Sequence, residues 1–153
     1  MVEGLKEFIK EYKIKTEYGK LVFYKAVSKE WGSLWVRRSM SYRHKGAANA
    51  YRIGTEVIFS GETDTIRKTI CGKGLHIGTL NCARLFTDCT RAFITLEGRQ
   101  RKIIKVLVDP EDVICVPLKH SRIYFSQKIR CKRLHVVAEV DQNGNHIKEV
   151  VSK

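Results

Sequence analysis

Reactive side chains lie densest in the stretch CGKGLHIGTLNCARLFTDC, from Cys71 to Cys89. The two glycines that flank its lysine leave the backbone free to approach another group closely. His76 then lies on a short apolar strand, and Thr79 can cap the helix predicted after it. A glycine turn and a histidine beside a helix N-terminus suit a phosphate-bearing ligand. We therefore expect a ligand or phosphate site made of Gly72, Lys73, Gly74, His76 and Thr79.

The cysteines allow other chemistry in the same stretch. Cys71 could act as a nucleophile, because a neighbouring lysine lowers a thiol pKa, but the sequence shows no base to activate it. A zinc site could draw on Cys71, His76, Cys82 and Cys89, at spacings that match none of the usual zinc motifs. Reduced thiols packed in the core are the simpler interpretation of all five cysteines. No metal is assigned.

The charge balance is the strongest global signal. The chain has 29 Lys and Arg against 16 Asp and Glu, which gives a formal net charge of +13. Such a surplus attracts polyanions, including nucleic acid. Two segments concentrate basic residues and are the predicted nucleic-acid contacts: Arg43, His44 and Lys45 in a loop, and Lys128, Arg130, Lys132 and Arg133 on a strand. The alternative is that the surplus serves only solubility.

Length and hydrophobicity set the class of protein. A chain of 153 residues, 43% of them hydrophobic, predicts a single folded domain over residues 1–153. No apolar run approaches the roughly 20 residues of a membrane span, and the start has no apolar signal-peptide core. We expect a cytoplasmic protein with no membrane partner.

The first half of the chain predicts a helix followed by strands. Apolar residues at helical spacing predict a helix over Leu5–Ile14. The β-branched and aromatic run Lys20–Val27 predicts a strand, with Ser33–Arg38 as its returning hairpin partner. Tyr51–Phe59 is a further predicted strand, interrupted at Gly54.

The second half predicts a central strand and a basic one. Lys102–Val108 is almost continuously apolar, which is typical of a strand covered on both faces. Asp112–Pro117 predicts a short strand. Lys128–Val140 predicts one long strand with a solvated cationic face, and Asn143-Gly144 predicts a hairpin turn after it.

These elements lie too close together for regular βαβ units. The fold class we expect is α+β, with strand-rich mixed or antiparallel sheets, an N-terminal helix and one helix near residues 79–88.

Two resemblances to known families rest on these motifs. The segments YRIGTEVIF, CGKGLHIGTLNCARLF, IIKVLVDPEDVICVP and KIRCKRLHVVAEV, in this order, resemble a small domain of bacteriophage and prophage proteins, some of them rIIB-like. This resemblance implies a phage or viral protein that works in the host cytoplasm, and it implies no activity.

The second resemblance is local. The segment GKGLHIGTLNCARLF is similar to part of the ADP-ribosyltransferase fold and of the related RNA 2′-phosphotransferases. It implies a split pair of sheets and an NAD pocket along Gly72 to Phe86. The catalytic residues implied are His76, Tyr24 and Glu139, although the first strand lacks the His-Gly or Arg-Gly of those enzymes.

Two functions follow from the sequence. The first is a basic accessory domain that binds nucleic acid or another polyanion without catalysis and without a cofactor. The alternative is an ADP-ribosyltransferase-like enzyme that uses NAD.

Overall fold

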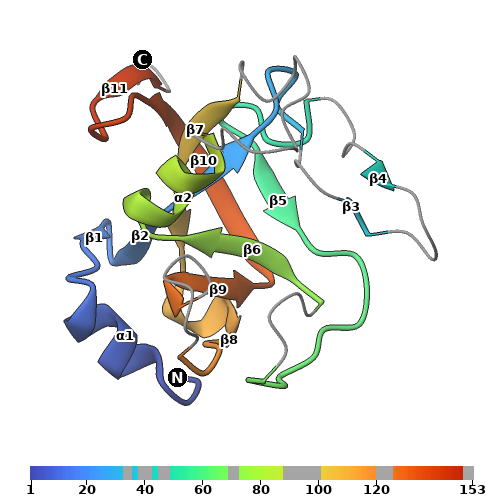
Figure 1. Cartoon of the computed structure of the whole chain (residues 1–153), viewed down its shortest axis with the longest axis vertical. Helices are drawn as coiled ribbons and strands as arrows, with labels where there is room; N and C mark the ends of the chain where they lie inside the picture. The colour runs from blue at the N-terminus through green and yellow to red at the C-terminus, as the bar shows by residue number, and fades with distance from the viewer. Residues whose placement is uncertain are drawn as a thin grey trace.

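The computed structural model describes residues 1–32, 49–68, 73–87, 101–119 and 126–149, with the backbone of two short strands at 36–37 and 43–44. Within these residues two α-helices pack on a sheet of nine strands (Figure 1). Every strand pair described is antiparallel. The expected strand-rich α+β fold with an N-terminal helix is confirmed.

The main sheet has the strand order β11-β10-β7-β2-β6-β9-β8, with β1 added to β2 and β5 added to β10. Its strands are β1 (Thr16–Glu17), β2 (Lys20–Val27), β5 (Glu56–Ile58), β6 (Leu75–Gly78), β7 (Lys102–Val108), β8 (Val113–Cys115), β9 (Lys128–Cys131), β10 (Arg133–Val140) and β11 (His146–Glu149). The other elements are α1 (Leu5–Glu11), α2 (Leu80–Thr87), a 3-10 turn (Pro110–Asp112) and a separate pair of strands, β3 (Val36–Arg37) and β4 (Arg43–His44).

The centre of the sheet is the pair β2 and β7, which is in register from Leu21 opposite Val108 to Val27 opposite Lys102. One face of this pair joins the larger core, to which α1 contributes Leu5 and Phe8. The other face packs on α2 through a smaller core that contains Ala83. The prediction that Lys102–Val108 is a central strand covered on both faces is therefore confirmed.

The sheet is nearly divided between β2 and β6. These strands share a single paired position, Tyr24 with Gly78. One position further along β2, the Lys25 ammonium donates a hydrogen bond of 2.7 Å to the His76 carbonyl. A side chain thus satisfies a backbone acceptor that a continued ladder would have used. The sheet consists of two halves joined at one point.

Two of the local predictions are confirmed at the residue level. The Asn143-Gly144 turn connects β10 to β11, with Gly144 at φ 85° and its N–H donating to the Asp141 carbonyl at 3.0 Å. At the start of α2 the Thr79 hydroxyl accepts a hydrogen bond of 3.1 Å from the Cys82 N–H. Both features depend on neighbours in sequence, which is why they were predictable.

The predicted hairpin between Lys20–Val27 and Ser33–Arg38 is wrong. Strand β2 pairs with β1, β6 and β7, whereas Val36–Arg37 pairs with Arg43–His44. Because β2 is buried over most of its length, its favourable partner is a strand of similar length and apolar content, and β7 is that strand.

The predicted strands at Tyr51–Phe59 and Lys128–Val140 are also shorter than expected. In the first, Gly54 adopts φ 91° and only Glu56–Ile58 forms a strand. In the second, the chain divides at Lys132, whose backbone N–H donates to the Asp112 carbonyl at 2.8 Å. β9 consequently pairs with β6 and β8, while β10 pairs with β5, β7 and β11.

Candidate functional site

The predicted phosphate site is closed by a carboxylate of the chain itself. Asp64 accepts a hydrogen bond of 2.9 Å from the Lys73 N–H and another of 2.8 Å from the Arg130 guanidinium. The Lys73 N–H and then the Arg130 side chain lower the pKa of Asp64 to about 2. The backbone donor and the cation that a phosphate would use are thus engaged with Asp64. Gly72 lies outside the described residues.

The other residues of this predicted site have structural contacts. The Thr79 hydroxyl donates to the Gln127 side-chain oxygen at 2.6 Å in addition to capping α2. A Cβ atom at Gly74 would lie 3.3 Å from the Arg130 Cβ, so this glycine allows close packing of backbone on β9. His76 lies on β6 directly opposite Arg130. Gly74, His76 and Thr79 therefore belong to a tightly packed junction between β6, β9 and the start of α2.

The predicted cationic strand face is wrong for two of its four residues. Lys128 is 8% exposed and Arg130 is fully buried. Besides Asp64, the Arg130 guanidinium donates to the Ile66 carbonyl at 2.9 Å, and its Nε is buried without a hydrogen-bond partner in the described structure. Lys132 and Arg133 are exposed, and Arg133 lies 3.6 Å from the Glu56 carboxylate.

The residues of the enzymatic alternative do not come together. Along β2, Tyr24 packs with the smaller core next to α2. Glu139 is the cross-strand partner of Ile104, which belongs to the larger core on the opposite face. Successive side chains of a strand alternate between faces, so Tyr24 and Glu139 lie on opposite sides of the sheet. Tyr24, His76 and Glu139 therefore form no common catalytic group, and no step through NAD is derived.

The predicted basic loop contains a short ribbon. Strand β4 places Arg43 opposite Arg37 and His44 opposite Val36. This pair of strands forms its own two-stranded sheet, which Figure 1 shows to one side of β5 and apart from the main sheet. Lys45 lies outside the described residues. The register therefore brings two arginines to directly opposed positions.

A different group of cations is both exposed and unpaired. It consists of five lysines on α1, on the segment after it and at the start of β2, which we call the lysine face: Lys6, Lys10, Lys13, Lys15 and Lys20. The first four are exposed and the fifth is partly exposed. None of the five has an ion pair or a side-chain hydrogen bond within the described part of the chain.

The acidic residues of the same segment are bound elsewhere. Glu3 lies 3.0 Å from Arg67 and Glu11 lies 2.8 Å from Lys119. The Glu17 carboxylate lies 2.5 Å from the ammonium of Lys105. Three of the four carboxylates between residues 1 and 20 are thus paired with cations outside this segment, and the fourth, Glu7, is exposed on α1 and has no ion pair within the described residues.

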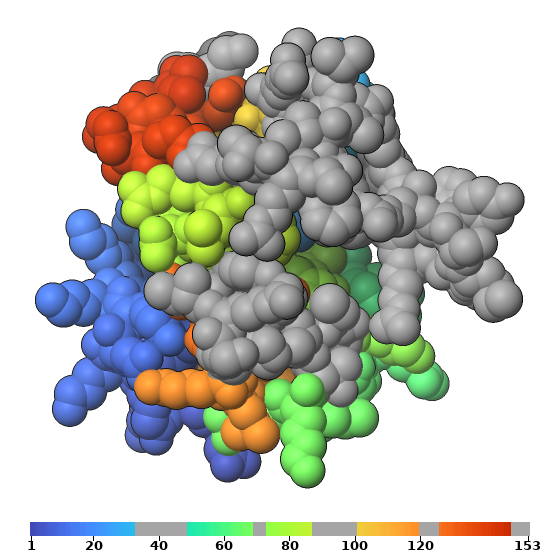
Figure 2. Space-filling view, in the orientation of Figure 1, coloured from blue at the N-terminus to red at the C-terminus, as the bar shows by residue number. Residues whose placement is uncertain are grey.

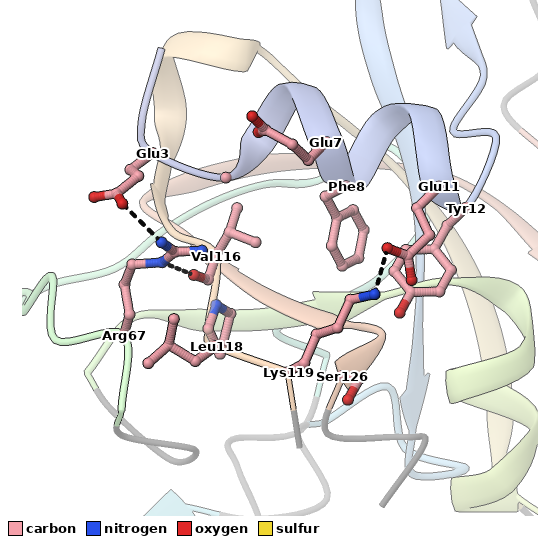
Figure 3. A pocket seen from close by; sticks show the side chains of 12 residues that line it. Glu3, Glu7, Phe8, Glu11, Tyr12, Arg67, Val116, Leu118, Lys119 and Ser126 are labelled. Carbon is pink, nitrogen blue, oxygen red and sulfur yellow. Dashed lines mark hydrogen bonds and ion pairs between the residues drawn. The ribbon is translucent and has the colours of Figure 1, made fainter. Parts of the chain in front are cut away.

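Helix α1 separates the two signs of charge. Residues four apart lie on the same side of a helix, so Glu7 and Glu11 share one flank and Lys6 and Lys10 share the next. The acidic flank borders a groove of about 460 Å³ between α1 and the chain after β8. Figure 3 shows the ion pairs of Glu3 with Arg67 and of Glu11 with Lys119 at this groove.

The segment that carries the lysine face lies at the periphery of the molecule. In Figure 2 the N-terminal segment, drawn in blue, forms one edge of the molecule with long side chains that project into solvent. The signal for this surface was present in the sequence as lysines at helical spacing. In the sequence these lysines alternate with glutamates, so the local pattern does not show which charges remain unpaired.

The helices also bear on the class of partner. Neither helix in the described residues has the length and apolar character needed to cross a membrane. Comparison of the chain with protein-family models, curated proteins and solved structures found no match. The functional assignment therefore depends on the geometry of the charges.

Proposed function

We propose that this protein binds nucleic acid, or a closely similar phosphate-bearing polyanion, on the lysine face. The observation that carries the proposal is the separation of charge in residues 1–20, where five lysines are unpaired while three carboxylates are held by distant cations. Unpaired ammonium groups along one short segment of the chain add to a positive field that attracts phosphates. No catalytic step and no cofactor are part of this proposal.

The energetic basis is the release of counterions. Each lysine that neutralises a phosphate displaces a condensed cation from the nucleic acid, and this release favours binding at low salt. A lysine already paired with a carboxylate would first have to give up its partner. The five lysines of the lysine face avoid this cost, because the structure gives them no ion pair to break.

Acidic membrane surfaces also attract lysines, and the packing of α1 favours nucleic acid over them. A helix that binds a membrane surface needs an apolar face to insert between lipids. The apolar residues Leu5 and Phe8 of α1 are 0% and 5% exposed, because they belong to the larger core. No apolar side of α1 remains available for lipid.

The test is a salt titration of binding to a labelled oligonucleotide, measured by fluorescence anisotropy. The triple variant Lys6→Gln, Lys10→Gln and Lys15→Gln removes three cations and keeps good helix-forming residues on α1. We expect the slope of log K against log salt to become less negative by about 2 to 3, since each phosphate contact contributes roughly 0.7 to 0.9.

The matched control removes the same charge from other exposed positions, Lys29→Gln, Arg52→Gln and Lys68→Gln. This control should retain most of the wild-type slope. An equal loss of slope in both triple variants would show that only the net charge matters. Wild-type binding that does not change with salt would reject the proposal altogether.

A further inference from the structure

We propose that Tyr18 stacks on an unpaired base, so that the ligand of the lysine face is single-stranded nucleic acid. This inference rests on the proposed function and adds to it the chemical class of the ligand. Tyr18 is 93% exposed, the highest value among the large hydrophobic residues that the structure describes as exposed. It lies in the turn between β1 and β2, within the segment that carries the lysine face.

The turn has a geometry that tyrosine does not favour. Glu17 and Lys20 are cross-strand partners, so Tyr18 and Gly19 form a two-residue loop. Their φ angles are 54° and 74°, and positive φ at both central residues is the pattern of a type I′ turn. Asparagine or glycine is the preferred first residue of this turn, because a bulky side chain is strained at positive φ.

Among the residues that the structure describes, no packing contact explains why tyrosine stands at this position. Its ring is almost wholly in solvent and contributes no buried area to either core. A strained residue without a structural role is a reason to look for a role in binding. A phenol ring held at the tip of a short hairpin is well placed to meet a flat ligand from solvent.

The cations around Tyr18 complete a surface suited to a single strand. Lys15 and Lys20 flank the turn, and Lys13 precedes them, itself at φ 51°. Proteins that bind single strands combine cations for the phosphates with exposed aromatic rings for the bases. A duplex keeps its bases stacked inside, so it offers phosphates to the lysines but no free base to the ring.

The experiment compares Tyr18→Asn and Tyr18→Phe in the full chain with wild type. The probes are labelled oligothymidine and oligouridine of ~15 nucleotides, within the range of single-strand site sizes, and a DNA duplex of matched length. We expect Tyr18→Asn to weaken single-strand binding about tenfold, a loss within the range typical of base stacking on an aromatic ring. Tyr18→Phe should bind like wild type.

The same variants separate a binding role from a structural one. Tyr18→Asn should raise the midpoint of thermal unfolding, because asparagine suits the turn better than tyrosine. The inference is overturned if Tyr18→Asn leaves single-strand affinity unchanged, if it weakens duplex binding by the same factor, or if wild type binds phosphatidylserine vesicles and no oligonucleotide. If only the first or second of these results is found while the lysine triple variant still loses its salt slope, the proposed function stands and the role of Tyr18 fails.

Discussion

Two groups of cations in this protein lie in opposite environments. The lysine face at the N-terminal edge is solvated and unpaired. Lys128 and Arg130 on β9 are buried, and Arg130 is bonded to Asp64 and to the Ile66 carbonyl. The first group is available to a ligand, whereas Arg130 holds the chain segment around Asp64 against the sheet.

The difference teaches that the density of basic residues along a sequence does not locate a binding surface. KIRCKR is the denser basic run, but β9 lies between β6 and β8, where both faces are covered. The lysines of α1 are diluted by glutamates in the sequence. They become a cationic surface only because the glutamates turn to Arg67, Lys119 and Lys105.

The distinction between the two groups of cations predicts its largest effect on the free energy of unfolding. Arg130→Met should destabilise the fold by about 3 kcal/mol in urea denaturation, because it removes a fully buried side chain together with its bonds to Asp64 and to the Ile66 carbonyl. Lys10→Met, on the lysine face, should change stability by less than about 0.5 kcal/mol. Similar losses in the two variants would contradict the distinction between structural and available cations.

Asp64→Asn tests the ion pair of Asp64 with Arg130 through pH. The folded-state pKa of Asp64 is lowered to about 2, so its stabilising charge is fully present above its ordinary pKa near 4 and is lost as the pH falls through 2. The variant should be less stable than wild type at neutral pH. The stability difference should disappear in acid denaturation experiments near pH 2, and a difference that persists there would mean that the ion pair is not its source.

A smaller effect is expected from Lys25, the partly buried cation at the division of the sheet. Burial, with a smaller contribution from Lys128, lowers the pKa of Lys25 to about 8, while the Cys131 and Cys82 thiols oppose this shift. A base with a lowered folded pKa destabilises the fold below that pKa, and the penalty is relieved as the pH rises towards its ordinary value near 10.4.

Comparison with Lys25→Met isolates this effect. The free energy of unfolding of wild type minus that of the variant should rise between about pH 8 and 10. The subtraction is needed because burial raises the pKa of the Cys82 and Cys131 thiols, to about 11 and 12, which lowers stability over the same pH range in both proteins. A flat difference would indicate that the Lys25 ammonium titrates as it does in solvent.

The smallest effect concerns the ribbon of β3 and β4. The register of the two strands places Arg37 opposite Arg43, and arginine is a common phosphate contact in nucleic-acid-binding proteins. Arg37→Gln with Arg43→Gln should leave stability within about 0.5 kcal/mol of wild type. If the ribbon is a second nucleic-acid contact, the salt slope of binding should fall by roughly 1 to 2, whereas an unchanged slope restricts binding to the lysine face.

Local features of the fold were predictable from sequence because their causes are local. Lys20–Val27 and Lys102–Val108 form strands with the predicted bounds, since β-branched runs of that length favour no other element. Strand partners were not predictable in the same way. The sequence of β2 is compatible both with a hairpin to Ser33–Arg38 and with pairing to β7. Contacts between residues far apart in the chain decide in favour of β7.

The predicted phosphate site also depends on contacts between residues distant in the sequence. Gly74 and Thr79 were expected at a phosphate site because glycine turns and helix caps often bind anions. Asp64, ten residues upstream of Gly74 in the sequence, takes the position of the anion. No local pattern could have shown that this carboxylate folds back onto Arg130.

The sequence by itself determined the net charge, the fold class and the elements whose signals are local, from α1 to the Asn143-Gly144 turn. The tertiary structure alone decided which cations face solvent. The exposure of each cation depends on strand pairing and on which cation each carboxylate contacts. Both involve residues that are distant in the chain. Charge is a property of composition, but an unpaired charge is a property of the folded arrangement.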